Sequence, residues 1–185
     1  MIGVLVAIDV VLGLAVALNL LLTLALIRRV GQRSEGGLRL TGLEPGEPAP
    51  DFEAETLDAS PVAASDLARG RSALLFISPG CQPCKDALPQ YVELAGFGRA
   101  SGIGVFLVSD GDVETTRDMI GRIESPPTVI VAPRSTNDLF SRWRVPATPH
   151  FVVVQDGVTV VSGPPSKTYP GWRNLLAELS SGVPA

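Results

Sequence analysis

The sequence predicts an α/β fold in which a central β-sheet is covered by helices on both faces, and three observations predict it. Short apolar runs alternate with segments whose apolar residues recur at helical spacing, which is typical of α/β layers. The only two cysteines stand between one such run and one such segment. The last part of the chain has the pattern of a β-hairpin followed by a helix.

The expected elements follow one another along the chain. Apolar runs predict strands at about residues 52–57, 73–78, 103–110 and 128–132. The stretch HFVVVQDGVTVVSG predicts a hairpin that turns at Asp156 and Gly157. Helices are predicted at 65–67, directly after the cysteines, from about 112 to 123, at 135–142 and at 170–179. Asp112 or Thr115 is expected to cap the third of these helices.

The stretch Cys81-Gln82-Pro83-Cys84 has the spacing of a redox pair. An apolar strand precedes it and a helix follows it, so Cys81 is expected at the first turn of that helix. A helix N-terminus favours an anion, and thiols placed there have pKa values lowered from about 8.5 to roughly 3.5–7.5. Cys84 lies one turn further in and is expected to be less exposed. We therefore predict that Cys81 attacks and Cys84 resolves, with Pro83 fitting the first turn.

Two other interpretations of the cysteine pair are a zinc site and a purely structural disulfide. A closed zinc site needs four ligands, and the chain has no third cysteine and a single histidine, His150. A disulfide across so short a loop removes little entropy from the unfolded chain. The strand–CxxC–helix setting therefore favours redox chemistry, for which no metal and no organic cofactor is expected.

Two blocks of the sequence resemble membrane-anchored, thioredoxin-like thiol–disulfide oxidoreductases of the TlpA type. The first runs from GEPAPDF to SPGCQPCKDALP, and its SPGCQPCK core is especially similar to the thioredoxin-like accessory proteins of methylamine utilisation. The second, RVPATPHFVVVQDGVTVVSG, resembles the cis-proline loop and the last hairpin of that family. The resemblance covers about Gly46 to Gly182 and implies a thioredoxin-like fold with a central mixed sheet flanked by helices.

The resemblance also implies a substrate-binding surface. It implies that the Thr148–Pro149 bond is cis and faces the cysteine pair, and that the backbone of Thr148 pairs with an extended segment of the substrate. Thr148, Pro149 and Pro83 are the residues expected to bind substrate. His150 is expected to be a structural residue at the start of a strand, with a catalytic base as the alternative.

Three positions depart from the family pattern. Gly80 stands where most thioredoxins have a tryptophan, and Leu75 stands where thioredoxin buries a carboxylate. Ala87 stands where some reductases of cytochrome maturation carry a glutamate. These differences concern proton transfer and leave the dithiol chemistry intact.

The function expected from these features is that of a membrane-tethered protein thiol–disulfide oxidoreductase. Its partners would be a disulfide- or thiol-bearing protein and a dithiol electron donor, for which a membrane protein is one option. Strong oxidants commonly have a histidine between their two cysteines, whereas Gln82 and Pro83 occupy these positions here. A disulfide reductase or an isomerase is therefore expected. The alternatives are a peroxiredoxin-like peroxidase, whose reactive cysteine would normally stand apart from a CxxC, and a non-catalytic chaperone or assembly module.

The N-terminal segment predicts a single membrane anchor. Residues 10–27 carry no charge and would form about 27 Å of helix, which with the apolar residues before Asp9 spans a bilayer of about 30 Å. A cleaved signal peptide is the alternative, but the basic start and the small-residue cleavage site are missing. Asp9 is expected in the headgroup region, with a functional intramembrane carboxylate as the alternative. The predicted organisation is an anchor at 1–28, a flexible linker at 29–46 and a thioredoxin-like domain at 47–182.

The side of the membrane on which the domain lies is predicted differently by two arguments. The cations nearest the anchor all follow it, which places the domain in the cytoplasm by the positive-inside rule: Arg28, Arg29, Arg33 and Arg39. The family resemblance implies the opposite, an extracytoplasmic domain, and we favour that side. The formal net charge of −4 argues against a nucleic-acid partner.

Overall fold

The computed structural model of the protein describes residues 42–181 except 68, 69, 122 and 124, and five positions nearer the N-terminus, namely 13, 16 and 18–20. The chain divides into two compact units, Met1–Leu38 and Arg39–Ala185. Across the described positions, no helix is both long enough and apolar enough to cross a membrane. Apart from those five positions, the predicted anchor lies outside the described residues.

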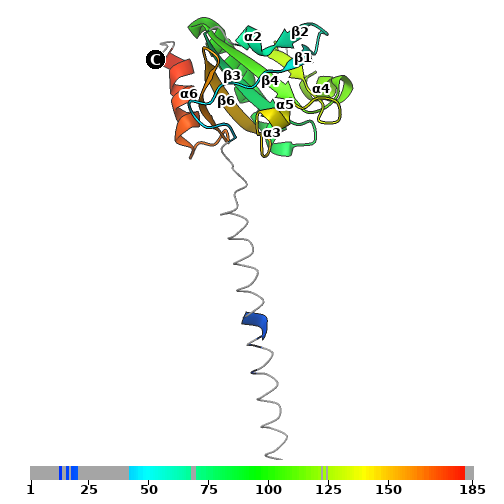
Figure 1. The fold of residues 1–185 in the computed structure, drawn as a ribbon, viewed down its shortest axis with the longest axis vertical. Coiled ribbons are helices and arrows are strands. Elements are labelled where there is room, and N and C mark those ends of the chain that lie inside the picture. The colour runs from blue at the N-terminus through cyan, green and yellow to red at the C-terminus, as the bar shows by residue number, and fades with distance from the viewer. Residues whose placement is uncertain are drawn as a thin grey trace, which may run out of the picture. The chain divides into compact units, whose positions relative to one another are not determined.

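The second unit is built on one seven-stranded sheet with the strand order β2-β1-β5-β4-β3-β6-β7 (Figure 1). Strand β3 pairs in parallel with β4 and β4 with β5, whereas all the other pairs are antiparallel. The mixed sheet predicted from the sequence is therefore confirmed. The strands are β1 (Glu53–Thr56), β2 (Pro61–Ala63), β3 (Arg71–Ile77), β4 (Ile103–Ser109), β5 (Thr128–Val131), β6 (His150–Gln155) and β7 (Val158–Gly163).

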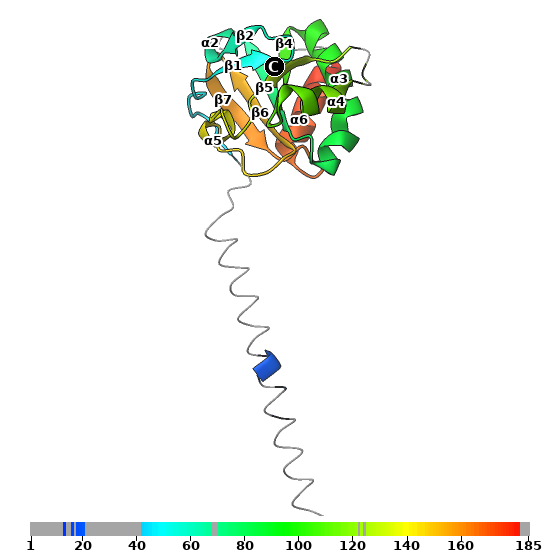
Figure 2. The same ribbon diagram turned by 90° about the vertical axis from the view of Figure 1, so that its right-hand side faces the viewer.

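Helices cover both faces of this sheet, as predicted (Figure 2). Buried side chains of α3, α4 and α6 join one hydrophobic cluster, and those of α2 and α5 join a second cluster on the opposite face. The helices are α2 (Ala64–Leu67), α3 (Gln82–Ser101), α4 (Val113–Ile120), α5 (Leu139–Arg142) and α6 (Pro170–Ser181).

Strand β3 contributes to both clusters because its side chains alternate between the two faces. Leu75 and Ile77 pack with α3 and α6, while Leu74 and Phe76 pack on the other side. The ring of Phe76 lies edge-on to that of Phe140, with centroids 5.2 Å apart. A strand buried on both faces holds its C-terminal end in a fixed place, and the cysteine pair follows that end directly.

Most predicted elements are found within a residue or two of their expected bounds, with three exceptions. Helix α4 ends at Ile120, three residues before its predicted end, and Gly121 is its C-cap. Strand β2 was not predicted, because three residues beginning with a proline carry no periodic signal. Helix α5 begins at Leu139 and not at 135, because the preceding residues form a turn in which Asn137 donates its N–H to the carbonyl of Pro133. The side chain of Asn137 then accepts from the N–H of Leu139 at 2.9 Å.

The packed domain begins earlier than the predicted boundary at residue 47. Leu43 is 2% exposed and belongs to the core cluster that contains Phe76. Gly46 donates its N–H to the carbonyl of Thr159 in β7, and Pro48 forms a β-bridge with Val158. The last residues of the predicted flexible linker are therefore part of the domain, and the rest of that linker, 29–41, lies outside the described residues.

Candidate functional site

The two cysteines form a disulfide at the start of α3. Cys81 is the N-cap residue of the helix, and its sulfur accepts the backbone N–H of Cys84 at 3.2 Å. Pro83 lies within the first turn, where its missing N–H has no helical partner to lose. The predicted position of Cys81 at the helix start is therefore confirmed, and its sulfur lies where a helix favours negative charge.

The two cysteines differ in exposure. Cys84 is fully buried in the cluster between the sheet and α3, whereas Cys81 is only partly buried at its edge. This difference follows from the helix, because a residue one turn further in is covered by the turn above it. Of the two, Cys81 is the residue that a large partner can reach.

The Thr148–Pro149 bond is cis, as the family resemblance implied. The carbonyl oxygen of Thr148 lies 3.4 Å from the sulfur of Cys81. Strand pairing accounts for this approach, because Phe76 of β3 is opposite His150 of the antiparallel β6. The segment leaving β3 and the segment entering β6 therefore meet at one edge of the sheet, next to the cysteine pair.

A third segment reaches the same edge from β4, which runs parallel to β3. It contains Gly111, where an added methyl group would contact the ring of Pro79 and approach Thr115 Oγ1 at 2.8 Å. Asp112 then caps α4 by accepting the N–H of Thr115 at 2.8 Å. Hydrogen bonds from the hydroxyl and the backbone N–H of Thr115 hold the pKa of Asp112 below its usual range.

His150 is buried next to this site but is already hydrogen-bonded. It is 2% exposed, and its Nε2 lies 2.9 Å from Oγ of Ser162, which is also buried. Burial lowers the pKa of His150 to about 4, so the imidazole is neutral at pH 7. These contacts agree with the structural role expected for this residue.

Beneath the cysteines the site is apolar. Leu75 is 1% exposed and lies in the same cluster as Cys84, so this position supplies no carboxylate to take up a proton. Tyr91 lies in that cluster as well, and burial raises the pKa of its hydroxyl.

The structure thus brings together Cys81, Cys84, Thr148 and Pro149, the residues predicted to form the site, with Pro83 exposed beside them. Two positions that support the site were missed. Ser162 was missed because its pairing depends on an irregularity in the hairpin, and Gly111 because a lone glycine after a strand gives no sign of what it contacts.

The fold and the site together define a thioredoxin-like oxidoreductase. Among solved structures, the chain is similar to the thioredoxin domain of a thiol-disulfide oxidoreductase from Bacteroides vulgatus, with a TM-score of 0.62 and 18% identity over 74% of this chain and 97% of that one. It is also similar to a putative thiol:disulfide interchange protein DsbE from Chlorobium tepidum, with a TM-score of 0.62 and 19% identity over 75% of this chain and 96% of that one.

The sequence places the chain within a family. Residues 45–162, more than half of the chain, match the model of the AhpC/TSA family. The chain is 30% identical over 165 residues to the methylamine utilization protein MauD of Paracoccus denitrificans, covering 85% of this chain and 79% of that protein. The chain belongs to the AhpC/TSA family.

The burial of His150 predicts a loss of stability in mild acid. Below about pH 6.5 the unfolded chain binds a proton at this residue, whereas the folded chain does so only near pH 4. The free energy of unfolding should therefore fall by up to about 3 kcal/mol between these two pH values. Urea unfolding at a series of pH values measures it.

The control is His150→Asn, measured against its own stability at pH 7. Because the chain has no second histidine, the difference between the two pH profiles reports His150 alone. Equal losses of stability in both proteins would show that the imidazole is not held neutral by the fold.

Proposed function

We propose that this protein is a membrane-tethered protein disulfide reductase in which Cys81 attacks and Cys84 resolves. The observation that carries the proposal is the asymmetry of the pair at the start of α3. Cys81 is partly exposed and its sulfur accepts a helix N–H, while Cys84 is buried. An exposed sulfur at a helix N-terminus is stabilised as the nucleophilic thiolate.

The reaction proceeds by two thiol–disulfide exchanges. The Cys81 thiolate attacks one sulfur of the substrate disulfide, and the other substrate sulfur leaves as a thiolate. Cys84, once deprotonated, attacks the sulfur of Cys81 and releases the second substrate thiolate. Two electrons have then passed to the substrate, and the enzyme holds the Cys81–Cys84 disulfide that the structure contains.

The surroundings of the pair bear on how protons move. Leu75 is apolar and His150 is neutral and bonded to Ser162, so neither is suited to relay a proton. We infer that the proton lost by Cys84 passes to the departing substrate thiolate or to water. The carbonyl of Thr148, 3.4 Å from the Cys81 sulfur, is suited to accept an N–H from an extended substrate segment.

The electrons must be restored by another dithiol carrier, because the chain contains no third cysteine. The tether is proposed from the uncharged stretch at residues 10–27. A membrane anchor would keep the domain close to a membrane-bound donor and raise the effective concentration of that donor.

The division of roles predicts which single variant traps a substrate. Cys84→Ser should accumulate a mixed disulfide through Cys81, because attack remains possible and release does not. Cys81→Ser should trap at least about ten-fold less, since Cys84 is fully buried. Non-reducing electrophoresis of the tagged protein from cells measures the adducts.

The double variant, Cys81→Ser with Cys84→Ser, is the matched control for adducts formed by other means. If Cys81→Ser traps as much partner as Cys84→Ser, the assigned roles are wrong.

The proposed direction predicts the reduction potential of the pair. We expect a value of about −270 mV, in the range of a reductant, and not about −120 mV, that of a strong oxidant. Equilibration with dithiothreitol buffers measures the potential, and insulin reduction measures turnover. A strongly oxidising potential would contradict the reductase function, and rapid consumption of hydrogen peroxide would indicate a peroxidase instead.

The side of the membrane yields a separate prediction. With the domain outside the cytoplasm, alkaline phosphatase fused after Ala185 should be active in cells, and a fluorescent protein that folds only in the cytoplasm should be dark. A fusion that begins at residue 42 lacks the apolar stretch and serves as the control, with inactive phosphatase. The reverse pattern for the full chain would mean that the four arginines set the orientation.

A further inference from the structure

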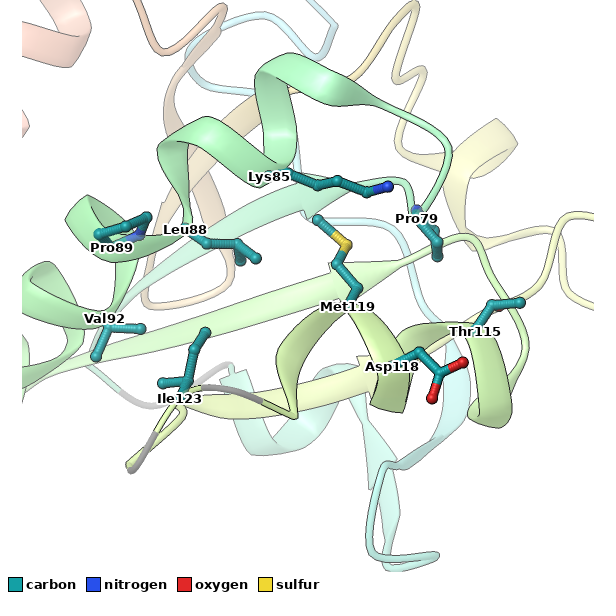
Figure 3. Close-up of a pocket in the computed structure, with 9 residues that line it drawn as sticks. All are labelled: Pro79, Lys85, Leu88, Pro89, Val92, Thr115, Asp118, Met119 and Ile123. Carbon is teal, nitrogen blue, oxygen red and sulfur yellow. The ribbon is translucent and has the colours of Figure 1, made fainter.

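An open, mostly apolar groove of about 970 Å³ lies between α3 and α4. Figure 3 shows side chains of α3 along one wall and Met119 of α4 pointing into the space from the other. The apolar lining consists of Pro79, Leu88, Pro89, Val92, Met119 and Ile123. No step of the reaction proposed above uses this groove.

The groove begins beside the loop that carries the cysteine pair. Pro79 lines it, and the loop that holds Pro79 is closed by a hydrogen bond from the N–H of Cys81 to the carbonyl of Ser78 at 3.0 Å. Gly111 lets the turn before α4 approach the ring of Pro79 closely. A protein segment that covers Cys81 therefore has the groove close by at Pro79, two residues earlier in the chain.

The charges at the groove indicate what kind of segment it accepts. One cation, Lys85 on α3, and one anion, Asp118 on α4, line it from opposite walls. Both side chains are exposed, and within the described part of the chain neither is in an ion pair. Such a balanced rim gives no preference for a polyanion or a polycation, and the apolar lining remains as the source of binding energy.

The dimensions indicate how such a segment is spaced. Along α3, Leu88 lies seven residues and Val92 eleven residues after Cys81, which is about 10 and 16 Å at 1.5 Å per residue. An extended peptide covers these distances in about three and five residues, and residues two apart point to the same side. Met119, a flexible thioether, can adapt to different apolar side chains.

We propose that this groove binds an extended apolar segment of the protein substrate, with apolar side chains about three and five residues from its reactive cysteine. The proposal rests on the reductase function proposed above and adds the substrate class. Recognition would then depend on apolar spacing and not on a particular sequence.

The test compares matched peptides whose single cysteine carries a thionitrobenzoate leaving group. One peptide has leucines at the third and fifth positions from the cysteine, and the other has serines at those positions. Separate peptides place these two residues before the cysteine or after it. The small disulfide dithiobis(nitrobenzoate) carries no peptide, so it reports the reactivity of the two cysteines without a contribution from the groove. The full chain is used in lipid nanodiscs, so that no detergent competes for an apolar site.

The leucine peptide should react at least about ten-fold faster than the serine peptide. Val92→Glu and Met119→Gln should each bring this ratio to within about two-fold of one. Val160→Glu is the matched control, because Val160 is exposed on β7 and does not line the groove, and it should keep the wild-type ratio. Circular dichroism checks that each variant is folded.

Each other outcome is decisive. If the small disulfide reacts and the leucine peptide has no advantage, the groove is not a substrate site, although the reductase function stands. If the groove variants change the sedimentation of the chain and leave the ratio unchanged, the groove is a contact between two copies and the proposal is wrong. If no disulfide reacts, the reductase function fails, and with it the inference that rests on it.

Discussion

The site depends on one hydrogen bond, from the backbone N–H of Cys84 to the sulfur of Cys81. Because this sulfur caps α3, the helix that stabilises a thiolate also sets the position of the second cysteine, one turn below and out of solvent. One local structure therefore places the proposed nucleophile at the helix start and shields its partner. A serine cap would hold the helix equally well, so cysteine at this position is explained by chemistry and not by folding.

The rest of the fold serves to bring other segments to this cap. Three strands, β3, β4 and β6, direct their connecting segments to one edge of the sheet, because β4 is parallel and β6 antiparallel to β3. The first segment carries the cysteines, the second begins α4, and the third carries the cis bond of Thr148–Pro149. Since β3 is buried on both faces, this edge has little freedom to move.

Much of this arrangement could be predicted from the sequence, because its signals are local. The cysteine spacing, the apolar run of β3 and the turn at Asp156 and Gly157 each specify a structure within a few residues. The partner of His150 could not be predicted, because the pairing of β6 with β7 shifts between Val153 and Val154. A regular two-residue hairpin would place Ser162 opposite Phe151, on the other face of the sheet. The bulge places it opposite Val152, on the face of His150.

The same limit explains why the groove was not predicted. Its two walls come from α3 and α4, which are separated in the chain by β4. No local sequence pattern predicts that these two helices lie close together. The turn before α4 touches the loop before Cys81 where Gly111 packs against the ring of Pro79. In the function proposed above, the Thr148 carbonyl binds the backbone of a substrate and the groove binds its side chains. Under this proposal, backbone hydrogen bonds would fix the approach of the substrate while adaptable apolar contacts would tolerate variation in its sequence.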